Sequence, residues 1–120
     1  MNLDATVRTL QFKFDAGTSR GVLKEHPVCL IKVSLLDNPN EFGIGEAAPL
    51  EKLSVEKIEE VIDFIPELRK RLKEEEFPLR EEEVYSMASS LVPSTLPSLR
   101  FALETALLDL LNGGISKIYE

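Results

Sequence analysis

The side chains best suited to bind a charged ligand lie together in the segment Thr18-Ser19-Arg20, which has a glycine on either side. A guanidinium is planar and always charged, so Arg20 can bind a carboxylate or a phosphate through parallel hydrogen bonds, and the neighbouring hydroxyls can add others. The segment lies within residues 15–26, a stretch that is long for a connection between two strands. It predicts either a glycine-hinged lid over a ligand or an ordinary surface loop with a solubilising arginine.

Nucleophilic catalysis around a histidine would depend on His26, the one histidine of the chain. Such a base activates a nearby nucleophile, and the candidates are Ser19 and Cys29. Nothing in their spacing fixes a geometry. His26 is therefore interpreted as a loop histidine without a catalytic partner.

The sequence contains no recognisable metal or nucleotide motif. The acidic runs at residues 74–76 and 81–83 are consecutive, so they predict solvated helix ends and not ligands that converge on one ion. A phosphate-binding loop of the Walker type is not present. The segment Gly43-Ile44-Gly45 has neither a third glycine in register nor a helix directly after it, so dinucleotide binding is not favoured.

The chain of 120 residues carries 21 acidic and 14 basic residues and a formal charge of -7. This balance argues against nucleic acid and anionic membrane surfaces as partners, because both bind clustered lysine and arginine. Cys29 is the single cysteine, so no disulfide framework can form. Because the sequence also lacks a secretory leader and a long apolar run, it predicts one cytoplasmic domain.

Strand patterns fill the first half of the chain at residues 7–14, 28–36 and 41–47, and turn residues separate the last two. The second half has helical patterns. The sequence therefore predicts an α+β fold, in which a three-stranded antiparallel β-meander is followed by a helical bundle. In the third strand, Gly43 and Gly45 predict a place where another backbone or a ligand approaches closely.

Helical periodicity predicts a first helix that starts at Ser54 and reaches residue 72, and Pro66 should kink or split it. Two further helices are predicted at residues 80–91 and 98–111. The last one is apolar over most of its circumference and needs cover on several sides. Either the chain is incomplete and leaves part of this helix exposed, or a compact domain surrounds it.

Three segments together give the chain a resemblance to a known family. They are Thr18-Ser19-Arg20-Gly21, Gly43-Ile44-Gly45-Glu46-Ala47-Ala48-Pro49-Leu50 and Leu96-Pro97-Ser98-Leu99-Arg100-Phe101-Ala102-Leu103-Glu104-Thr105-Ala106-Leu107-Leu108-Asp109-Leu110-Leu111. In this order they resemble the N-terminal capping domain of the enolase superfamily, more narrowly its muconate-lactonizing subgroup and the o-succinylbenzoate synthases of menaquinone biosynthesis. The resemblance extends over essentially the whole chain.

The resemblance implies that residues 1–112 form a capping domain and that residues 113–120 begin the connection to an absent (β/α)7β barrel. In the family, the barrel carries the acid/base lysines and the carboxylates that bind Mg2+. The reaction is the dehydration of a cyclohexadiene carboxylate to o-succinylbenzoate. The parent protein is therefore expected to be a metal-dependent lyase acting on a small carboxylate, whereas the chain alone is expected to be inactive and to hold no metal ligands.

Carried over residue by residue, the resemblance gives the cap two substrate-facing loops but no catalytic residue. Gly43, Gly45 and Pro49 are expected to shape the second loop, and Glu46 is expected to brace it through backbone amides. The implied substrate-binding positions are Thr18, Ser19, Arg20, Gly21, Ala47 and Leu50.

Two alternatives stay open at this point. Dipeptide epimerases and N-acylamino-acid racemases of the same subgroup have the same cap, and their substrates are determined largely by the barrel. The other alternative is a free-standing interaction module whose apolar last helix binds a partner chain.

Overall fold

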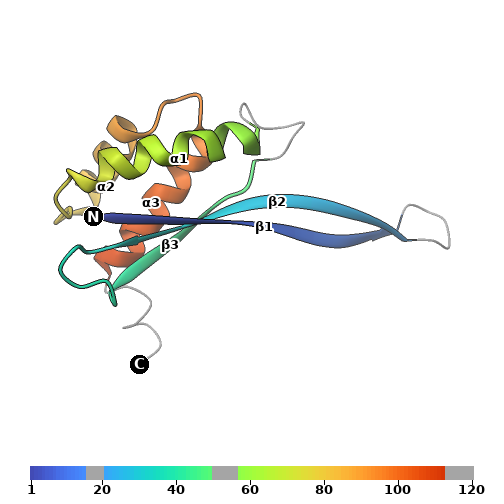
Figure 1. Cartoon of the computed structure of the whole chain (residues 1–120), viewed down its shortest axis with the longest axis horizontal. Helices are drawn as coiled ribbons and strands as arrows, with labels where there is room; N and C mark the ends of the chain where they lie inside the picture. Colours follow the sequence, from blue (N-terminus) through green and yellow to red (C-terminus); the bar gives the residue numbers. More distant parts are fainter. Residues whose placement is uncertain (16–20, 50–56, 113–120) are drawn as a thin grey trace.

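The computed structural model describes residues 1–15, 21–49 and 57–112, and for residues 9–15 and 21–26 it describes the main chain alone. The strands β1 (Asn2–Asp15), β2 (Gly21–Ser34) and β3 (Phe42–Ala47) precede the helices α1 (Ile58–Lys73), α2 (Glu81–Leu91) and α3 (Pro97–Leu111). The strands form one antiparallel sheet in the order β1-β2-β3. The predicted α+β fold with its meander is therefore confirmed (Figure 1).

The first two strands are longer than the sequence pattern predicts. β1 begins at Asn2, and β2 begins at Gly21, so residues 21–26 belong to a strand and not to a long loop. The reason is cross-strand pairing: Leu10 lies opposite His26, and the register continues to the end of both strands. Backbone hydrogen bonds of this kind form whatever the side-chain pattern. The interpretation of His26 as a loop histidine was therefore wrong.

β1 and β2 extend well beyond the third strand. β3 pairs with β2 only between Cys29 and Ser34. Past this stretch, the first two strands continue as a two-stranded ribbon that projects from the rest of the molecule (Figure 1). The last pair of the ribbon joins Asp15 to Gly21, so the ribbon leads into residues 16–20.

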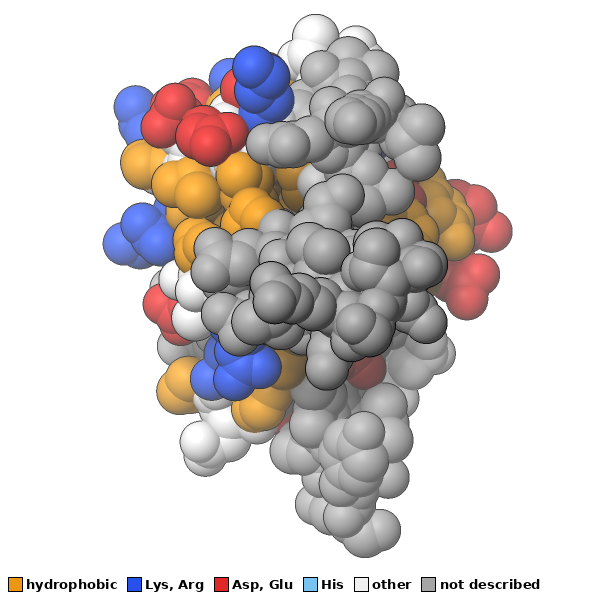
Figure 2. Space-filling view, turned by 90° about the vertical axis from the view of Figure 1, so that its right-hand side faces the viewer, with side chains coloured by type: hydrophobic (Ala, Val, Ile, Leu, Met, Phe, Trp, Pro, Cys, Tyr) orange, Lys and Arg blue, Asp and Glu red, His pale blue; other side chains and the backbone are white. Residues whose placement is uncertain are grey.

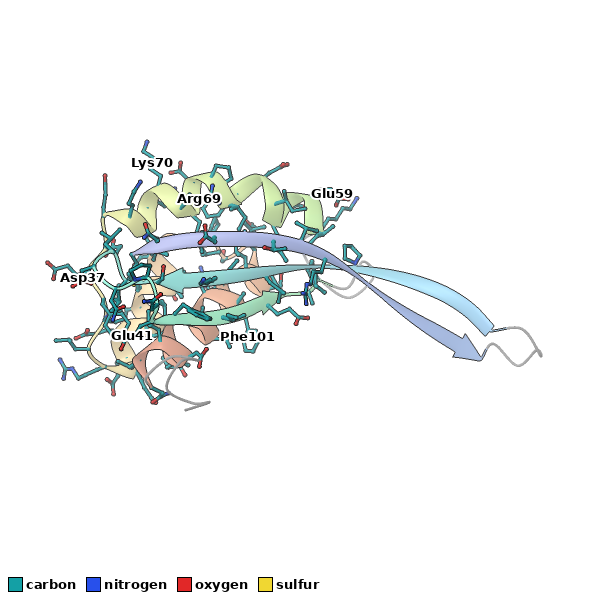
Figure 3. All side chains as sticks on the ribbon, turned by 60° about the horizontal axis from the view of Figure 1, so that its bottom comes forward. Asp37, Glu41, Glu59, Arg69, Lys70 and Phe101 are labelled. Carbon is teal, nitrogen blue, oxygen red and sulfur yellow. The ribbon has the colours of Figure 1, made fainter. Side chains whose placement is uncertain are left out.

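The helices cover one face of the sheet and leave the other face without helical cover, as Figure 3 shows from the open side. Leu3, Ile31 and Val33 are buried in the core, whereas their neighbours Asp4 and Lys32 alternate to the open face. Each helix contributes a buried stripe to the same core: Val61, Ile65, Leu68 and Leu72 from α1, Val84, Ala88 and Leu91 from α2, and Leu99, Ala102, Leu103, Ala106, Leu107 and Leu110 from α3.

α1 differs from its prediction at its start and at its proline. It begins at Ile58 after the N-cap Lys57, whose main-chain N–H donates to the carboxylate of Glu60 at 3.3 Å. The predicted cap, Ser54, lies outside the described residues. Pro66 does not split the helix, because it is on the exposed side and the buried stripe of α1 continues past it. The carbonyl group that loses its partner can then bond to water.

α3 is only partly covered by the domain. Leu103 is buried, whereas Phe101 is 64% exposed and Leu108 and Leu111 are half-buried. Of the two predicted cases, exposure of part of this apolar helix is the one observed. Figure 2 shows the molecule from the end where the ribbon projects. On this face, other hydrophobic side chains also reach the surface and lie between charged side chains.

Candidate functional site

β3 lies directly against the main chain of α3. A Cβ atom on Gly43 would overlap with the carbonyl oxygen of Ala106, and one on Gly45 would overlap with the carbonyl oxygen of Ala102. Ala102 and Ala106 are one helical turn apart, so the helix presents two small residues to the glycines of the strand. The glycines thus make room for a helix of this same chain. This corrects the interpretation that they shape a substrate-facing loop.

Both edges of the sheet are tied to a helix by a charged side chain. At the β3 edge, the carboxylate of Asp109 accepts a hydrogen bond from the main-chain N–H of Ile44 at 3.2 Å. At the β1 edge, Nε of Arg69 donates to the main-chain carbonyl oxygen of Leu3 at 2.9 Å. The outward-facing main-chain groups of edge strands have no strand partner, so these side chains satisfy two of them and hold the sheet in place against the helices.

The predicted substrate-binding residues fall partly outside the described chain. Those outside it are Thr18, Ser19, Arg20 and Leu50, whose role stays a prediction. Gly21 starts β2 and pairs with Asp15 at the far end of the ribbon. Ala47 ends β3 and is 0% exposed, so its side chain packs in the core of the domain. Glu46 is exposed, and its carboxylate accepts no hydrogen bond within the described ranges, so its bracing role also stays a prediction.

The strand register places the two predicted loops after the same end of the sheet. Ala47 pairs with Cys29, and Cys29 pairs on its other side with Val7. From this row of residues, β1 and β2 continue into the ribbon, and the chain leaves β3 through Ala48 and Pro49 (Figure 1). The segments that lead to residues 16–20 and 50–56 therefore depart from the same end of the sheet.

Cys29 is buried in the core, and burial raises the pKa of its thiol by desolvation. It is therefore a poor nucleophile.

We expect iodoacetamide to alkylate Cys29 slowly in the native protein at mildly alkaline pH and rapidly in urea, as measured by mass spectrometry. Because folding raises this pKa, its contribution to stability is complete below the thiol pKa of the unfolded chain and is lost as the pH rises through the folded value. Rapid labelling of the native protein would contradict the burial.

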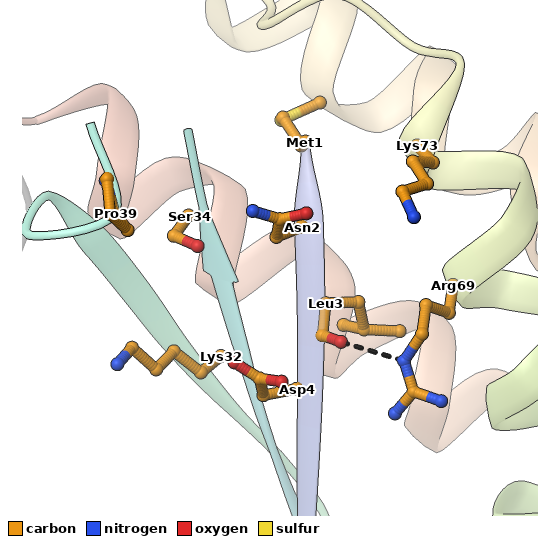
Figure 4. Close-up of a pocket in the computed structure, with 9 residues that line it drawn as sticks. All are labelled: Met1, Asn2, Leu3, Asp4, Lys32, Ser34, Pro39, Arg69 and Lys73. Atoms are coloured by element: carbon orange, nitrogen blue, oxygen red, sulfur yellow. Dashed lines mark hydrogen bonds between the residues drawn. The ribbon is translucent and has the colours of Figure 1, made fainter. Parts of the chain in front are cut away.

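A separate hollow lies at the beginning of β1 and has a volume of about 280 Å³ (Figure 4). Its lining contains three basic side chains and one acidic one, although the chain as a whole has a charge of -7. The hollow is at the opposite end of the sheet from the ribbon and includes none of the predicted substrate-binding residues. The lining residues are Met1, Asn2, Leu3, Asp4, Lys32, Ser34, Pro39, Arg69 and Lys73.

Among the residues that the structure describes, no group of three or more His, Cys, Asp or Glu side chains is placed to hold a metal ion. The Mg2+ that the resemblance implies therefore finds no ligand set there, and no reaction step is assigned to it. In the same part of the chain, none of the helices has the length and apolar character needed to cross a membrane.

The fold defines an α+β domain in which an antiparallel meander is covered on one face by helices, and a solved structure has the same arrangement. The crystal structure of MenC from Desulfotalea psychrophila LSv54 matches 92% of this chain with a TM-score of 0.57 and 22% sequence identity. At this level of identity, the match establishes the fold. The matched region is 35% of the MenC chain.

Sequence comparison identifies a relative with a named activity. The chain is 35% identical over 136 residues to an o-succinylbenzoate synthase from Desulfotalea psychrophila (strain LSv54 / DSM 12343). The alignment covers 95% of this chain and 36% of the relative, so the chain spans about a third of the protein that it matches. No protein-family model matches the chain. The predicted resemblance to o-succinylbenzoate synthases is therefore confirmed.

Proposed function

We propose that the chain is the N-terminal substrate-capping domain of an o-succinylbenzoate synthase. The observation that carries this proposal is the match of 95% of the chain, at 35% identity, to part of a protein with that name. Because the match covers 36% of the relative, the remaining length has room for a barrel domain that carries the catalytic lysines and the Mg2+ ligands. The complete protein would then be a lyase of menaquinone biosynthesis.

The architecture supports a capping role in physical terms. A cap acts by excluding water and orienting the substrate, and both require loops that are held by a rigid scaffold. Here β3 is packed against the main chain of α3, and the chain leaves β3 toward residues 50–56 from the same end of the sheet as the ribbon. In this proposal, Arg20 binds a substrate carboxylate through its guanidinium, and Leu50 forms an apolar wall.

The proposal is tested on the complete protein that carries this chain. We expect the reading frame to continue past Glu120 into a barrel with a Lys-x-Lys motif. We also expect the purified protein, supplied with Mg2+, to convert the cyclohexadiene carboxylate to o-succinylbenzoate in an absorbance assay. Epimerisation of Ala-Glu or racemisation of an N-acylamino acid, without dehydration, would support the alternative enzymes of the subgroup. A frame that ends at Glu120 would support the interaction module.

Arg20→Ala should weaken substrate use in the complete enzyme and leave its fold intact. Loss of a charge-assisted hydrogen bond to a carboxylate is expected to lower kcat/KM by roughly 10- to 100-fold. The measurement is steady-state kinetics together with a thermal melt. Arg8→Ala is the matched control, since Arg8 is an exposed arginine of β1 that lies outside residues 16–20. An unchanged kcat/KM in Arg20→Ala would remove Arg20 from the substrate site.

A further inference from the structure

We propose that the hollow at the start of β1 binds a phosphoryl group, either free phosphate or the end of a phosphomonoester. We call it the phosphoryl pocket and define its binding groups as Asn2 of β1, Ser34 of β2, and Arg69 and Lys73 of α1. The proposal does not depend on the capping role, because this pocket contains none of the residues assigned to the substrate loops.

Arg69 is held in a fixed orientation at the edge of the pocket. Its Nε donates to the main-chain carbonyl oxygen of Leu3 at 2.9 Å, as the dashed line in Figure 4 shows. Within the described residues, its two terminal nitrogens form no hydrogen bond or ion pair. A guanidinium that is already oriented by one bond loses little freedom when its remaining donors bind an anion.

Lys73 lies one helical turn after Arg69 and lines the same pocket. Figure 4 shows both side chains on the side of α1 that faces the beginning of β1. Like charges at this spacing repel each other. Neither side chain forms an ion pair with a carboxylate of the described residues. An anion between them would relieve this repulsion.

Ser34 supplies the evidence for a ligand that can accept a hydrogen bond. It is only 4% exposed and lines the pocket, yet its hydroxyl makes no hydrogen bond with the described part of the chain. The Ser34 hydroxyl is not one of the fully buried polar atoms, so it opens into the hollow, where it can donate a hydrogen bond to a bound group. Asn2, its register partner on β1, adds amide donors.

The acid of the lining does not cancel this positive charge. Asp4 is paired in register with Lys32, whose side chain extends away from Asp4 in Figure 4 and brings its ammonium 4.2 Å from the ring centroid of Phe42. No ion pair joins Asp4 and Lys32 in the described structure, but the lining as a whole has three basic side chains against one acidic one, an excess of two positive charges. The donors come from two strands and a helix, so they can approach the several oxygens of a phosphoryl group from more than one side. A planar carboxylate would be satisfied by the arginine fork alone.

The test is calorimetric titration of the complete protein with inorganic phosphate and with phenyl phosphate, at an ionic strength held constant with sodium chloride. We expect saturable binding that is weakened about tenfold or more in Arg69→Gln and in Lys73→Gln, since each loses a charge-assisted contact. Lys73→Gln removes no hydrogen bond of the described structure and so keeps the test valid if Arg69→Gln unfolds. Lys70→Gln is the matched control, because Lys70 is an exposed neighbour on α1 that does not line the pocket (Figure 3).

Tighter binding of phenyl phosphate would assign the pocket to a phosphomonoester, and equal binding would assign it to free phosphate. The proposal is overturned if neither compound binds saturably, if all three variants bind like the unmodified protein, or if succinate binds as tightly as phosphate. These outcomes are independent of dehydratase activity, so failure of this proposal and failure of the proposed function are distinguishable.

Discussion

Gly45→Ala should destabilise the domain by about 4 kcal/mol or more, a loss typical of the most damaging core substitutions. The added methyl group would overlap with the carbonyl oxygen of Ala102 and lie 2.7 Å from its carbonyl carbon. Both atoms are main chain, so no change of rotamer relieves the overlap, and α3 must move away from β3. Since domains of this kind have about 5–15 kcal/mol of stability in total, much of the chain should be unfolded. Urea denaturation followed by circular dichroism measures the effect.

Two further variants make this expectation specific to the main-chain contact. Glu46→Ala changes an exposed residue of the same strand and should alter the free energy of unfolding by less than about 0.5 kcal/mol. Adding Ala102→Gly to Gly45→Ala should not restore stability, because the overlapping atoms belong to the main chain of Ala102. A loss below about 1 kcal/mol in Gly45→Ala would show that β3 and α3 are not in direct contact.

Leu103→Ala should lower the free energy of unfolding by about 2–5 kcal/mol, the range for removing a large aliphatic side chain from a core. Leu103 is 0% exposed and belongs to the core between α3 and the sheet. Truncation removes its buried surface and leaves a cavity that its neighbours can only partly fill. The loss should appear as a lower urea midpoint with an unchanged slope of the transition.

Phe101→Ala is the matched control on the same helix, two residues earlier. The Phe101 ring is 64% exposed, so its removal should change the stability of the chain by less than about 0.5 kcal/mol. Equal losses for the two variants would mean that α3 does not present the faces described. A loss at Phe101 that appears only in the complete protein would indicate that another part of the protein covers this ring.

The sequence was a good guide to the type and order of the elements and a poorer guide to their ends. Alternating and helical periodicities are local signals, and they predicted the meander and the three helices correctly. The extension of β2 back to Gly21 was missed, because it depends on pairing with β1 and not on a hydrophobic pattern. Pro66 was expected to kink or split α1. The helix is not split, because the proline is on its exposed side and the buried stripe continues past it.

For the candidate sites, the local pattern was less informative. The resemblance to o-succinylbenzoate synthases came from motifs along the chain and was confirmed by comparison with a relative. The phosphoryl pocket had no sequence signal, since its members come from β1, β2 and α1 and are separated by tens of residues. The available hint was the cluster of basic residues in the last turn of α1. Such a cluster does not by itself indicate a ligand, because basic side chains also stabilise the negative end of a helix dipole.

By itself, the sequence determined the α+β order of the elements and the family resemblance, because both are written in short-range patterns of residue types. It also indicated that Gly43 and Gly45 meet another backbone or a ligand. Only the tertiary structure decided between a backbone and a ligand, because the partner is the main chain of α3, some 60 residues away in the sequence. Carbonyl oxygens are common to all residues and carry no sequence signal, so this contact appears only when the helix is packed on the strand.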